Sequence, residues 1–424
     1  MATPVTRYHV VGIGGAGMSA VARILLARGH AVSGSDTGRW PLSDALARDG
    51  ATVHDGFVAE QVAGADVVIR SSAYQEDNPE VRAALERGIV VWKRDDAWRE
   101  IAHGQRVIAI AGTHGKSTTT ALTWLALRAG GIDATLVCGA VLRDVGSNAH
   151  AGRDDVLVIE ADEYDNAFLA LDPEVAVVTT VDHDHVDLFP TAASYRTAFE
   201  SFVARIVPGG ALVHSQDDPG ARSLAEWASR HTHARLIPYD GLDGTLRLAG
   251  AHNARNAAAA VAAAGCLGVD RATASAAVRG FSGVERRLEP LGMAGEIRVV
   301  DDYAHHPAEI AAGIDTYGEG AVVVFQPHTP SRLAAFFDDF VVVLRRARAV
   351  VIVETFRSAR EPADPHGRAR ALADAVGGVY APDGETAARL AADFARPGEA
   401  VLVMGAGDVR PVGLRVLELL RMPV

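Results

Sequence analysis

The stretch VIAIAGTHGKST at residues 107–118 places a short apolar run directly before a glycine loop that ends in Lys116 and Ser117. The run is typical of a buried strand, and residues 118–129 after it have helical composition. A strand, a glycine loop and a helix in this order bind phosphate, because the loop and the helix N-terminus offer backbone N–H groups. The Lys116 ammonium would reach the outer phosphates of a nucleotide, and the Ser117 hydroxyl would bind Mg²⁺. Ile110 stands where a full Walker A pattern has glycine, so the loop is a shortened form.

Short apolar runs alternate with helical stretches over the whole chain, which predicts α/β domains with parallel sheets. The expected strands are His9–Ile13, Val67–Ile69, Val107–Ala111, Val156–Glu160, Val175–Thr180, Ile297–Asp302, Val322–Phe325, Val350–Val353 and Val401–Met404. The expected helices include Ser19–Arg28, Thr118–Ala129, Asn253–Ala264 and Thr386–Phe394. With 424 residues, a typical size of about 150 residues per domain predicts three domains. We place the cuts near residues 104 and 287, which gives domains 1–104, 105–287 and 288–424.

The composition excludes several classes of protein. The chain has 41 Lys and Arg residues against 53 Asp and Glu residues, a formal charge of −12, whereas non-specific binding to nucleic acid or anionic membranes needs a basic face. Two cysteines exclude a disulfide scaffold and a thiolate zinc cluster. No secretory signal is visible, and the longest uncharged run, Ala257–Val269, is too short to span a bilayer. We therefore expect a soluble, cytoplasmic protein that binds no nucleic acid and has no segment inserted in a membrane.

A second glycine loop, GIGGAG at residues 12–17, also lies between an expected strand and an expected helix. This G-x-G-x-x-G arrangement is typical of dinucleotide-binding domains, and Asp36 stands where a ribose contact is expected. Alone, the loop is compatible with a simple strand–helix turn or with a nicotinamide-dependent dehydrogenase. Two phosphate-binding loops in different domains instead indicate two ligands that carry phosphate, as in a kinase or a ligase that uses ATP.

Acidic and histidine residues follow two of the expected strands. The stretch EADEYD at residues 160–165 follows one strand, and DHDHVD at residues 182–187 follows another. In an extended chain, His183 and His185 would lie on one side, as in a metal hydrolase, but Leu188 stands where that pattern has a third histidine. The alternative places His185 beside the Mg²⁺ of the lysine-containing loop. We expect Lys116, Glu160 and His185 to converge at the carboxyl ends of neighbouring strands.

Four further motifs lie downstream, and each has a structural and a functional interpretation. In HNARN at residues 252–256 the asparagines would cap a helix or bind a nucleotide. Arg286 and Arg287 would form an exposed pair or anchor an anion. In DDYAHHP at residues 301–307, at least one aspartate should face the site and Pro307 should open a helix. The fourth motif is FQPHTPSR at residues 325–332.

Together these segments resemble the Mur ligase family over almost the whole chain. The resemblance rests on all the motifs above and on GVERR at residues 283–287 and MGAGD at residues 404–408. It implies a Rossmann-like domain for a UDP-sugar, a central ATPase domain, and a Rossmann-like C-terminal domain that binds the amino acid. It also implies an ATP-dependent ligase that joins L-alanine to the lactyl carboxylate of UDP-N-acetylmuramate through an acyl phosphate, in peptidoglycan precursor synthesis. The alternative within the family is a recycling ligase that attaches L-Ala-γ-D-Glu-diaminopimelate. The alternative outside it is an NAD-dependent oxidoreductase.

The resemblance also implies roles for individual residues. The catalytic set is Lys116, Glu160, His185, Arg287 and Asp302. ATP would be accompanied by two Mg²⁺ ions, or by Mn²⁺ in their place, and would be held by Gly112, Thr113, His114, Gly115, Lys116, Ser117, Thr118, His252, Asn253, Asn256, Arg287 and Asp302. The metal ligands would be Ser117, Glu160 and His185. The UDP-sugar would contact Gly14, Gly15, Ala16, Gly17, Asp36, Ser71 and Ser72. The amino acid or the acyl phosphate would contact His305, His306 and Arg332.

Two features depart from the family pattern. Pro330 replaces a residue that is usually aromatic, which puts a contact near the nucleotide in question. The stretch Ile237–Gly250 is shorter than in most relatives and predicts a reduced strand pair in the central domain.

Overall fold

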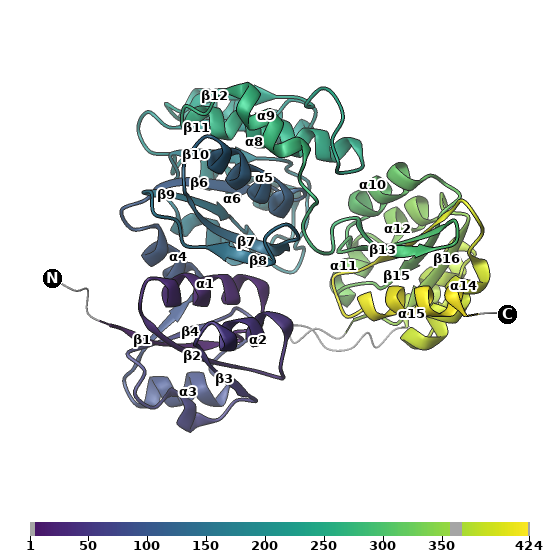
Figure 1. Cartoon of the computed structure of the whole chain (residues 1–424), viewed down its shortest axis with the longest axis horizontal. Helices are drawn as coiled ribbons and strands as arrows, with labels where there is room; N and C mark the ends of the chain where they lie inside the picture. The colour runs from purple at the N-terminus through teal and green to yellow at the C-terminus, as the bar shows by residue number, and fades with distance from the viewer. Residues whose placement is uncertain (1–4, 357–366, 423–424) are drawn as a thin grey trace. The chain divides into compact units, whose positions relative to one another are not determined.

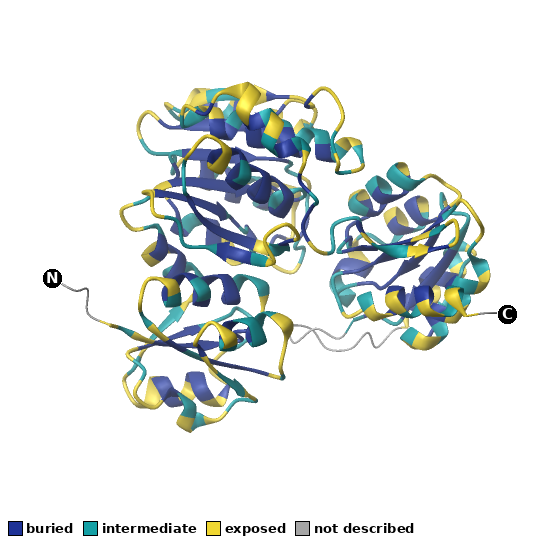
Figure 2. Cartoon of the chain, viewed as in Figure 1, coloured by how far each residue is buried: buried dark blue, intermediate teal, exposed yellow. Residues whose placement is uncertain are grey.

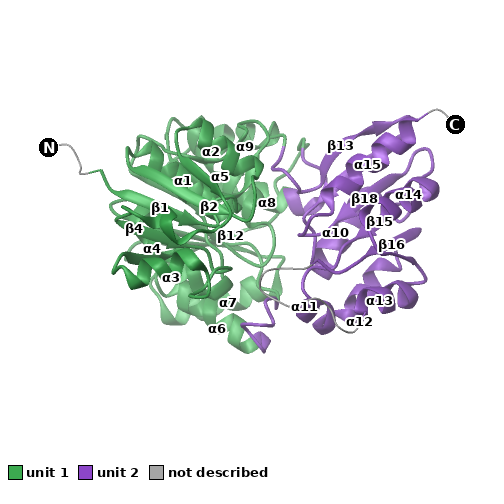
Figure 3. Cartoon of the chain, turned by 90° about the horizontal axis from the view of Figure 1, so that it is seen from below, with its two compact units in different colours: residues 1–182, 193–247, 254–282 green, residues 183–192, 248–253, 283–424 purple. Residues whose placement is uncertain are grey.

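The computed structural model describes residues 5–356 and 367–422. Three sheets follow one another along the chain, and helices pack on their faces (Figure 1). The predicted α/β class with parallel sheets is therefore confirmed. The chain forms two compact units (Figure 3). Unit 1 contains residues 1–182, 193–247 and 254–282 with the first two sheets, and unit 2 contains residues 183–192, 248–253 and 283–424 with the third sheet.

The first sheet has five parallel strands in the order β3-β2-β1-β4-β5. Its strands are β1 (Arg7–Val11), β2 (Ala31–Asp36), β3 (Thr52–Asp55), β4 (Val67–Arg70) and β5 (Val90–Lys93). Its helices are α1 (Ala16–Ala27), α2 (Pro41–Arg48), η1 (Ala59–Val62), α3 (Pro79–Glu86) and α4 (Arg94–Ala102). The strand order reverses between β1 and β4, where a doubly wound sheet binds its ligand. The loop after β1 is the glycine loop (residues 12–17).

The second sheet has seven strands in the order β12-β11-β10-β6-β9-β7-β8, all parallel except β8. Its strands are β6 (Arg106–Ala111), β7 (Thr135–Leu142), β8 (Ser147–His150), β9 (Val156–Glu160), β10 (Val175–Val178), β11 (Ala211–Ser215) and β12 (Arg235–Tyr239). Its helices are α5 (Lys116–Ala129), η2 (Tyr164–Ala170), α6 (Ala192–Val203), α7 (Pro219–His231), α8 (Ala251–Cys266) and α9 (Arg271–Arg279). Residues 240–250 form neither helix nor strand. Because β9 and β10 flank β6, the residues that follow them surround the lysine loop (residues 112–116).

The third sheet has six strands in the order β13-β14-β18-β15-β16-β17, with β13 antiparallel to β14. Its strands are β13 (Glu289–Ala294), β14 (Ile297–Asp302), β15 (Val322–Phe325), β16 (Ala349–Val353), β17 (Val379–Ala381) and β18 (Ala400–Met404). Its helices are α10 (Pro307–Tyr317), α11 (Pro330–Ala335), α12 (Phe337–Leu344), α13 (Arg368–Val376), α14 (Gly384–Phe394) and α15 (Arg410–Arg421). As predicted, Pro307 is the first residue of a helix; Pro330 also begins one.

The central strands of each sheet are buried, whereas edge strands such as β3 and β5 and the outer faces of the helices are more exposed (Figure 2). In β10 and β15 every residue is buried, which explains why such strands read as unbroken apolar runs in the sequence. Among the described residues, no helix is both long enough and apolar enough to cross a bilayer.

Candidate functional site

The lysine loop has the backbone of a phosphate-binding turn. Gly112 and Gly115 adopt φ angles of +134° and +82°, which residues with a side chain rarely adopt. Gly115 then caps α5, whose first residue is Lys116. A Cβ atom on Gly115 would lie 2.5 Å from Oδ1 of Asn256. The predicted nucleotide residue Asn256 therefore lies against this loop, inside α8 rather than at its cap.

Lys116 is held among carbonyl and carboxylate oxygens. Its Nζ donates to the carbonyl oxygens of Gly112 (2.6 Å) and Thr113 (3.2 Å) and to Oε1 of Glu163 (3.1 Å). Burial lowers the pKa of Lys116, but the carboxylates of Glu163, Asp162 and Glu160 raise it by more, so the pKa lies above its ordinary value. The ammonium thus stays charged at the base of the loop.

Beside Lys116, Ser117 and Glu160 present oxygen atoms of the kind that bind metal ions. The Ser117 hydroxyl donates to Oε1 of Glu160 at 3.0 Å, and the backbone N–H of Gly139 donates to Oε2 at 2.6 Å. Hydroxyl and carboxylate oxygens are the ligands that Mg²⁺ prefers. This donor set fits the predicted magnesium site.

Several side chains that the sequence analysis did not single out support the loop. Glu163 is fully buried and accepts from the Tyr195 hydroxyl at 2.9 Å. After β10, the Thr179 hydroxyl donates to the carbonyl oxygen of His114 at 2.5 Å, and the Thr180 hydroxyl accepts from its N–H at 2.9 Å. Glu163 lies within the EADEYD motif and was visible there, whereas Tyr195 lies in α6 outside any motif.

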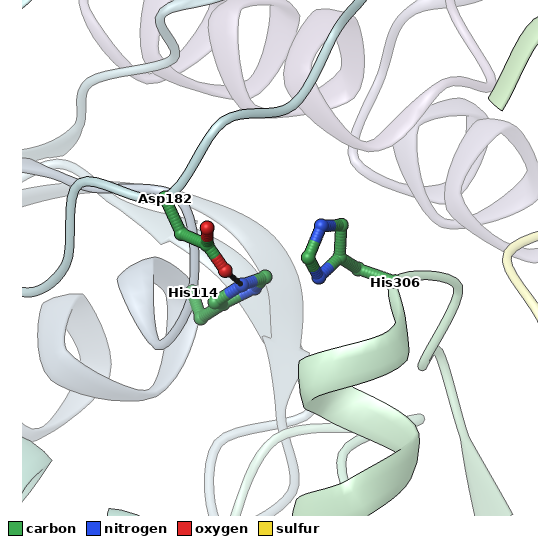
Figure 4. A group of neighbouring side chains, drawn as sticks. All are labelled: His114, Asp182 and His306. Carbon is green, nitrogen blue, oxygen red and sulfur yellow. Dashed lines mark ion pairs between the residues drawn. The ribbon is translucent and has the colours of Figure 1, made fainter. Parts of the chain in front are cut away.

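His114 lies beside Asp182 at the carboxyl end of β10, with Nε2 3.6 Å from Oδ2, a contact that is an ion pair only when His114 is protonated (Figure 4). The Thr113 hydroxyl donates to the Asp182 carbonyl oxygen at 2.7 Å. Both contacts tie the lysine loop to the start of the DHDHVD motif. Figure 4 also shows His306, which belongs to unit 2 and precedes α10.

The glycine loop carries a different set of neighbours. The N–H of Gly14 donates to Oδ2 of Asp36 at 2.9 Å, so the predicted Asp36 reaches the loop. A Cβ atom on Gly14 would lie 2.5 Å from Cδ1 of Trp40, and one on Gly12 would lie 2.8 Å from Cε2 of Tyr74. Two aromatic rings thus lie against the loop. Burial and the Asp36 carboxylate raise the pKa of Tyr74 to about 12, so its hydroxyl is neutral.

The other predicted residues of this loop lie nearby. A Cβ atom on Gly12 would lie 3.5 Å from Cβ of Ser71, which follows β4. Ser72 is the next residue, and its carbonyl oxygen accepts from Gln75 at 3.0 Å. The carbonyl oxygen of Ala16 accepts from Nδ2 of Asn148 at 2.7 Å, which links α1 to β8 of the second sheet.

Within unit 2, the DHDHVD chain is not extended, so His183 and His185 do not form the one-sided pair of a metal hydrolase. His185 has a φ angle of +51°, and its carbonyl oxygen accepts from the N–H groups of Leu188 and Phe189. Its convergence with Glu160 stays a prediction, because His185 belongs to unit 2 and Glu160 to unit 1.

Arg332 has a partner that the sequence analysis missed. Its Nε and Nη2 donate to the two carboxylate oxygens of Asp184 at 2.9 and 3.2 Å, and both side chains are buried. Burial raises the pKa of Asp184, but Arg332, His185 and His305 lower it by more, so the pKa lies below its ordinary range. Two donor groups of the Arg332 fork are therefore engaged within the protein.

The buried Asp302 and the partly buried His305, near the end of β14, have strongly shifted pKa values. Burial raises the pKa of Asp302 to about 7, although Arg287 opposes the shift. Burial lowers the pKa of His305 to about 4, and its Nδ1–H donates to the carbonyl oxygen of Tyr303 at 2.9 Å. His305 and His306 differ in orientation, as predicted: His306 caps α10 and packs on the ring of Phe336.

The remaining predicted residues of unit 2 are His252, Asn253 and Arg287. Asn253 lies inside α8 with Nδ2 donating to the carbonyl oxygen of Ala249 at 2.7 Å, so it does not cap the helix. The imidazole of His252 lies beside Gly250. Nη1 of Arg287 lies 3.2 Å from Oε1 of Glu309.

Comparisons with known proteins agree with this architecture. Three family models match: the Mur ligase family catalytic domain over residues 7–106, the Mur ligase middle domain over 110–241, and the Mur ligase glutamate ligase domain over 286–407. The UDP-N-acetylmuramate–L-alanine ligase of Roseiflexus sp. is 41% identical, over 98% of this chain and 99% of its own. The ligase of the same name from Nocardioides sp. is 43% identical, over 98% of this chain and 96% of its own.

Among solved structures, UDP-N-acetylmuramate-alanine ligase from Thermotoga maritima matches with a TM-score of 0.79 and 26% identity, over 97% of this chain and 98% of its own. A murein peptide ligase from Psychrobacter arcticus has a TM-score of 0.75 at 23% identity and covers 99% of both chains, which is evidence for the fold alone. All of these matches are to ligases, and none supports the alternative of a nicotinamide-dependent oxidoreductase. The chain belongs to the Mur ligase family.

Proposed function

We propose that this chain is an ATP-dependent ligase that joins L-alanine to the lactyl carboxylate of UDP-N-acetylmuramate, a cytoplasmic step of peptidoglycan precursor synthesis. Its relatives from Roseiflexus and Nocardioides carry that name and match over nearly the whole chain. One observation of the structure supports the proposal most directly. Unit 1 contains two loops of the phosphate-binding type, the glycine loop and the lysine loop. Only the lysine loop holds a lysine among carboxylates. This is the arrangement expected when one ligand is bound and another transfers a phosphoryl group.

At the lysine loop, Lys116 and the N-terminus of α5 would neutralise charge on the phosphate as it moves to the muramoyl carboxylate. The phosphate oxygens would replace the loop carbonyls and Glu163 that Lys116 contacts here. Thr113, His114, Thr118 and Asn256 would line the same loop. The resulting acyl phosphate makes the carboxylate an acyl donor for the amino group of alanine, which then displaces phosphate.

A magnesium ion would be held by Ser117 and Glu160, with His185 serving a second metal site. Bound there, the metal would neutralise phosphate charge in the transition state. Glu160 is prepared for this role by the N–H of Gly139, which fixes one carboxylate oxygen.

The glycine loop would bind the UDP moiety through Gly14, Gly15, Ala16, Gly17, Asp36, Ser71 and Ser72. The residues of the C-terminal domain would complete the reaction: Arg287 and Asp302 toward ATP, and His305, His306 and Arg332 toward the amino acid. We assign His252 and Asn253 to the nucleotide. The three domains would meet near residues 104 and 287.

Phosphate release from Mg-ATP and UDP-N-acetylmuramate tests this function, with L-alanine, glycine, L-serine or L-Ala-γ-D-Glu-diaminopimelate as acceptor. We expect release that requires the UDP-sugar and is fastest with L-alanine. A preference for the tripeptide would move the assignment to the recycling ligase. Absence of release with every acceptor would refute the proposed reaction.

A further inference from the structure

The turn at residues 286–288 has an unusual backbone. Arg286 and Leu288 adopt φ angles of +57° and +45°. This left-handed region is unfavourable for residues with a side chain, and such strain persists only where the surroundings enforce it. Between the two strained residues lies Arg287, to which we assign a contact with ATP. The contacts that hold the turn therefore decide where Arg287 lies.

Arg286 is tied to two neighbouring segments of unit 2. Its Nη2 donates to the carbonyl oxygen of Gly405 at 2.7 Å, and its own carbonyl oxygen accepts from the N–H of Tyr303 at 2.6 Å. The guanidinium also lies 4.9 Å from the centre of the Tyr303 ring, a cation–π contact. Side chain and backbone together fasten the turn to the end of β14 and to the MGAGD motif after β18.

A second arginine completes the support. Arg410, the first residue of α15, donates to Oε2 of Glu289 and to Oδ2 of Asp301, both at 2.6 Å. The same Oε2 of Glu289 accepts from the backbone N–H of Arg286 at 2.9 Å. Asp301 is fully buried and also lies 3.6 Å from Nε of Arg286. Two guanidinium groups thus balance two carboxylates around the turn.

Arg287 shares the aromatic ring that anchors its neighbour. Its guanidinium lies 5.1 Å from the centre of the Tyr303 ring, and its Nη1 lies 3.2 Å from Glu309. Any relaxation of φ at Arg286 would rotate the following peptide and move Arg287 away from this position. Small displacements of such a group have large effects on transfer reactions.

We propose that Arg286 is a positioning residue: supported by Asp301, Glu289 and Arg410, it holds the strained turn so that Arg287 is placed to bind the nucleotide. The inference rests on the proposed function for the role of Arg287. It gives a task to Arg286, Asp301 and the MGAGD segment, none of which has a direct role in the reaction as we propose it.

Replacing Arg286 by glycine and by alanine separates positioning from other roles. Arg286→Ala removes the side-chain anchors to Gly405, Asp301 and the Tyr303 ring but keeps the unfavourable φ, so the turn should relax. Arg286→Gly removes the same anchors, but glycine adopts this φ without cost. We expect the KM for ATP to be higher in Arg286→Ala than in Arg286→Gly. The ratio of the two KM values should be about 5 to 30, which corresponds to the free-energy cost of a left-handed φ at a residue with a side chain. KM and kcat for ATP and the melting temperature are measured for each variant of the full chain.

The matched control is Arg415→Gln, which replaces an arginine on α15, the helix that begins with Arg410. Arg415 lies at the surface and pairs with Glu385 and Glu418, each at 2.9 Å, so its loss should leave the KM for ATP unchanged. Equal KM values for Arg286→Gly and Arg286→Ala would overturn the proposal. It would also be overturned if the increases in the KM for ATP simply followed the decreases in melting temperature. If Arg286→Ala does not fold, Arg286→Gln, which keeps the same strain, takes its place.

Equilibrium binding of ADP is measured on the same variants. If the unaltered chain releases no phosphate with any acceptor, the proposed reaction fails, and the ADP affinities still decide the positioning role. A weaker affinity for Arg286→Ala than for Arg286→Gly supports it, and equal affinities refute it.

Discussion

The glycine loop and the lysine loop occupy equivalent places after β1 and β6, yet their neighbours differ. The glycine loop is bordered by the rings of Trp40 and Tyr74 and by one carboxylate, Asp36. The lysine loop contains a partly buried ammonium, and Glu160 and Glu163 lie beside it. The helix that follows the glycine loop begins from the extended residue Gly15 (φ −67°), whereas Gly115 before α5 is left-handed (φ +82°).

Under the proposed function, this difference would separate ligand binding at the glycine loop from phosphoryl transfer at the lysine loop. Aromatic rings and backbone N–H groups are sufficient to hold a nucleoside diphosphate that does not react at its phosphates. A migrating phosphoryl group requires fixed positive charge and oxygen ligands for a metal. The same strand–loop–helix unit therefore serves either task, according to the side chains that surround it.

The largest expected effect is that of Lys116→Ala. Loss of the ammonium should lower kcat for phosphate release by about 10³-fold, while the dissociation constant for UDP-N-acetylmuramate changes by less than about tenfold. Calorimetric titration with the UDP-sugar and a phosphate-release assay measure the two quantities. Lys93→Ala is the control, because Lys93 is half-exposed and lies 3.8 Å from Asp165. An equal loss of UDP-sugar affinity would contradict the separation of the two loops.

A smaller effect is expected from Glu160→Gln, which removes the negative charge of the proposed magnesium ligand. The concentration of Mg²⁺ that gives half-maximal phosphate release should rise by about 10- to 100-fold. Binding of the UDP-sugar should be unaffected by this variant and by chelation of the metal, because Glu160 lies at the lysine loop. Asp36→Asn, at the glycine loop, is the matched substitution and should leave the Mg²⁺ requirement unchanged. A shift of that requirement in Asp36→Asn would break the comparison.

The two helix-capping glycines give a paired test of backbone geometry. Gly115→Ala places a Cβ atom 2.5 Å from Oδ1 of Asn256 at a left-handed φ, and should cost about 1–2 kcal/mol of unfolding free energy. At Gly15 the nearest atom to a Cβ, the carbonyl oxygen of Gly12, is 3.4 Å away and φ is ordinary, so Gly15→Ala should cost much less. Urea unfolding of both variants gives the comparison. Similar losses would show that the two loops do not differ in backbone strain.

Much of the fold could be predicted from the sequence, because strands buried on both faces leave unbroken apolar runs. The predicted and observed limits agree at Val156–Glu160 and Val322–Phe325. The two loops were also predictable, since each lies within a few consecutive residues. The turn at His185 was not, because the preceding Asp184 pairs with Arg332, far along the chain. Tyr195 was missed for the same reason: its contact with Glu163 forms only when α6 packs on the sheet.

The smallest expected effect concerns the aromatic border of the glycine loop. Trp40 is 48% exposed and its indole lies against Gly14, so Trp40→Ala removes a face on which a base or ribose can pack. The loss should weaken UDP-N-acetylmuramate binding by about fivefold, the low end for a stacking contact, and leave the KM for ATP unchanged. Intrinsic fluorescence gives a direct readout, because quenching by UDP should be reduced in Trp40→Phe and kept in Trp227→Phe, whose indole stacks on His231 in α7. Undiminished quenching in Trp40→Phe would assign the ligand to another face of the loop. The two loops would then differ in charge but not in aromatic recognition.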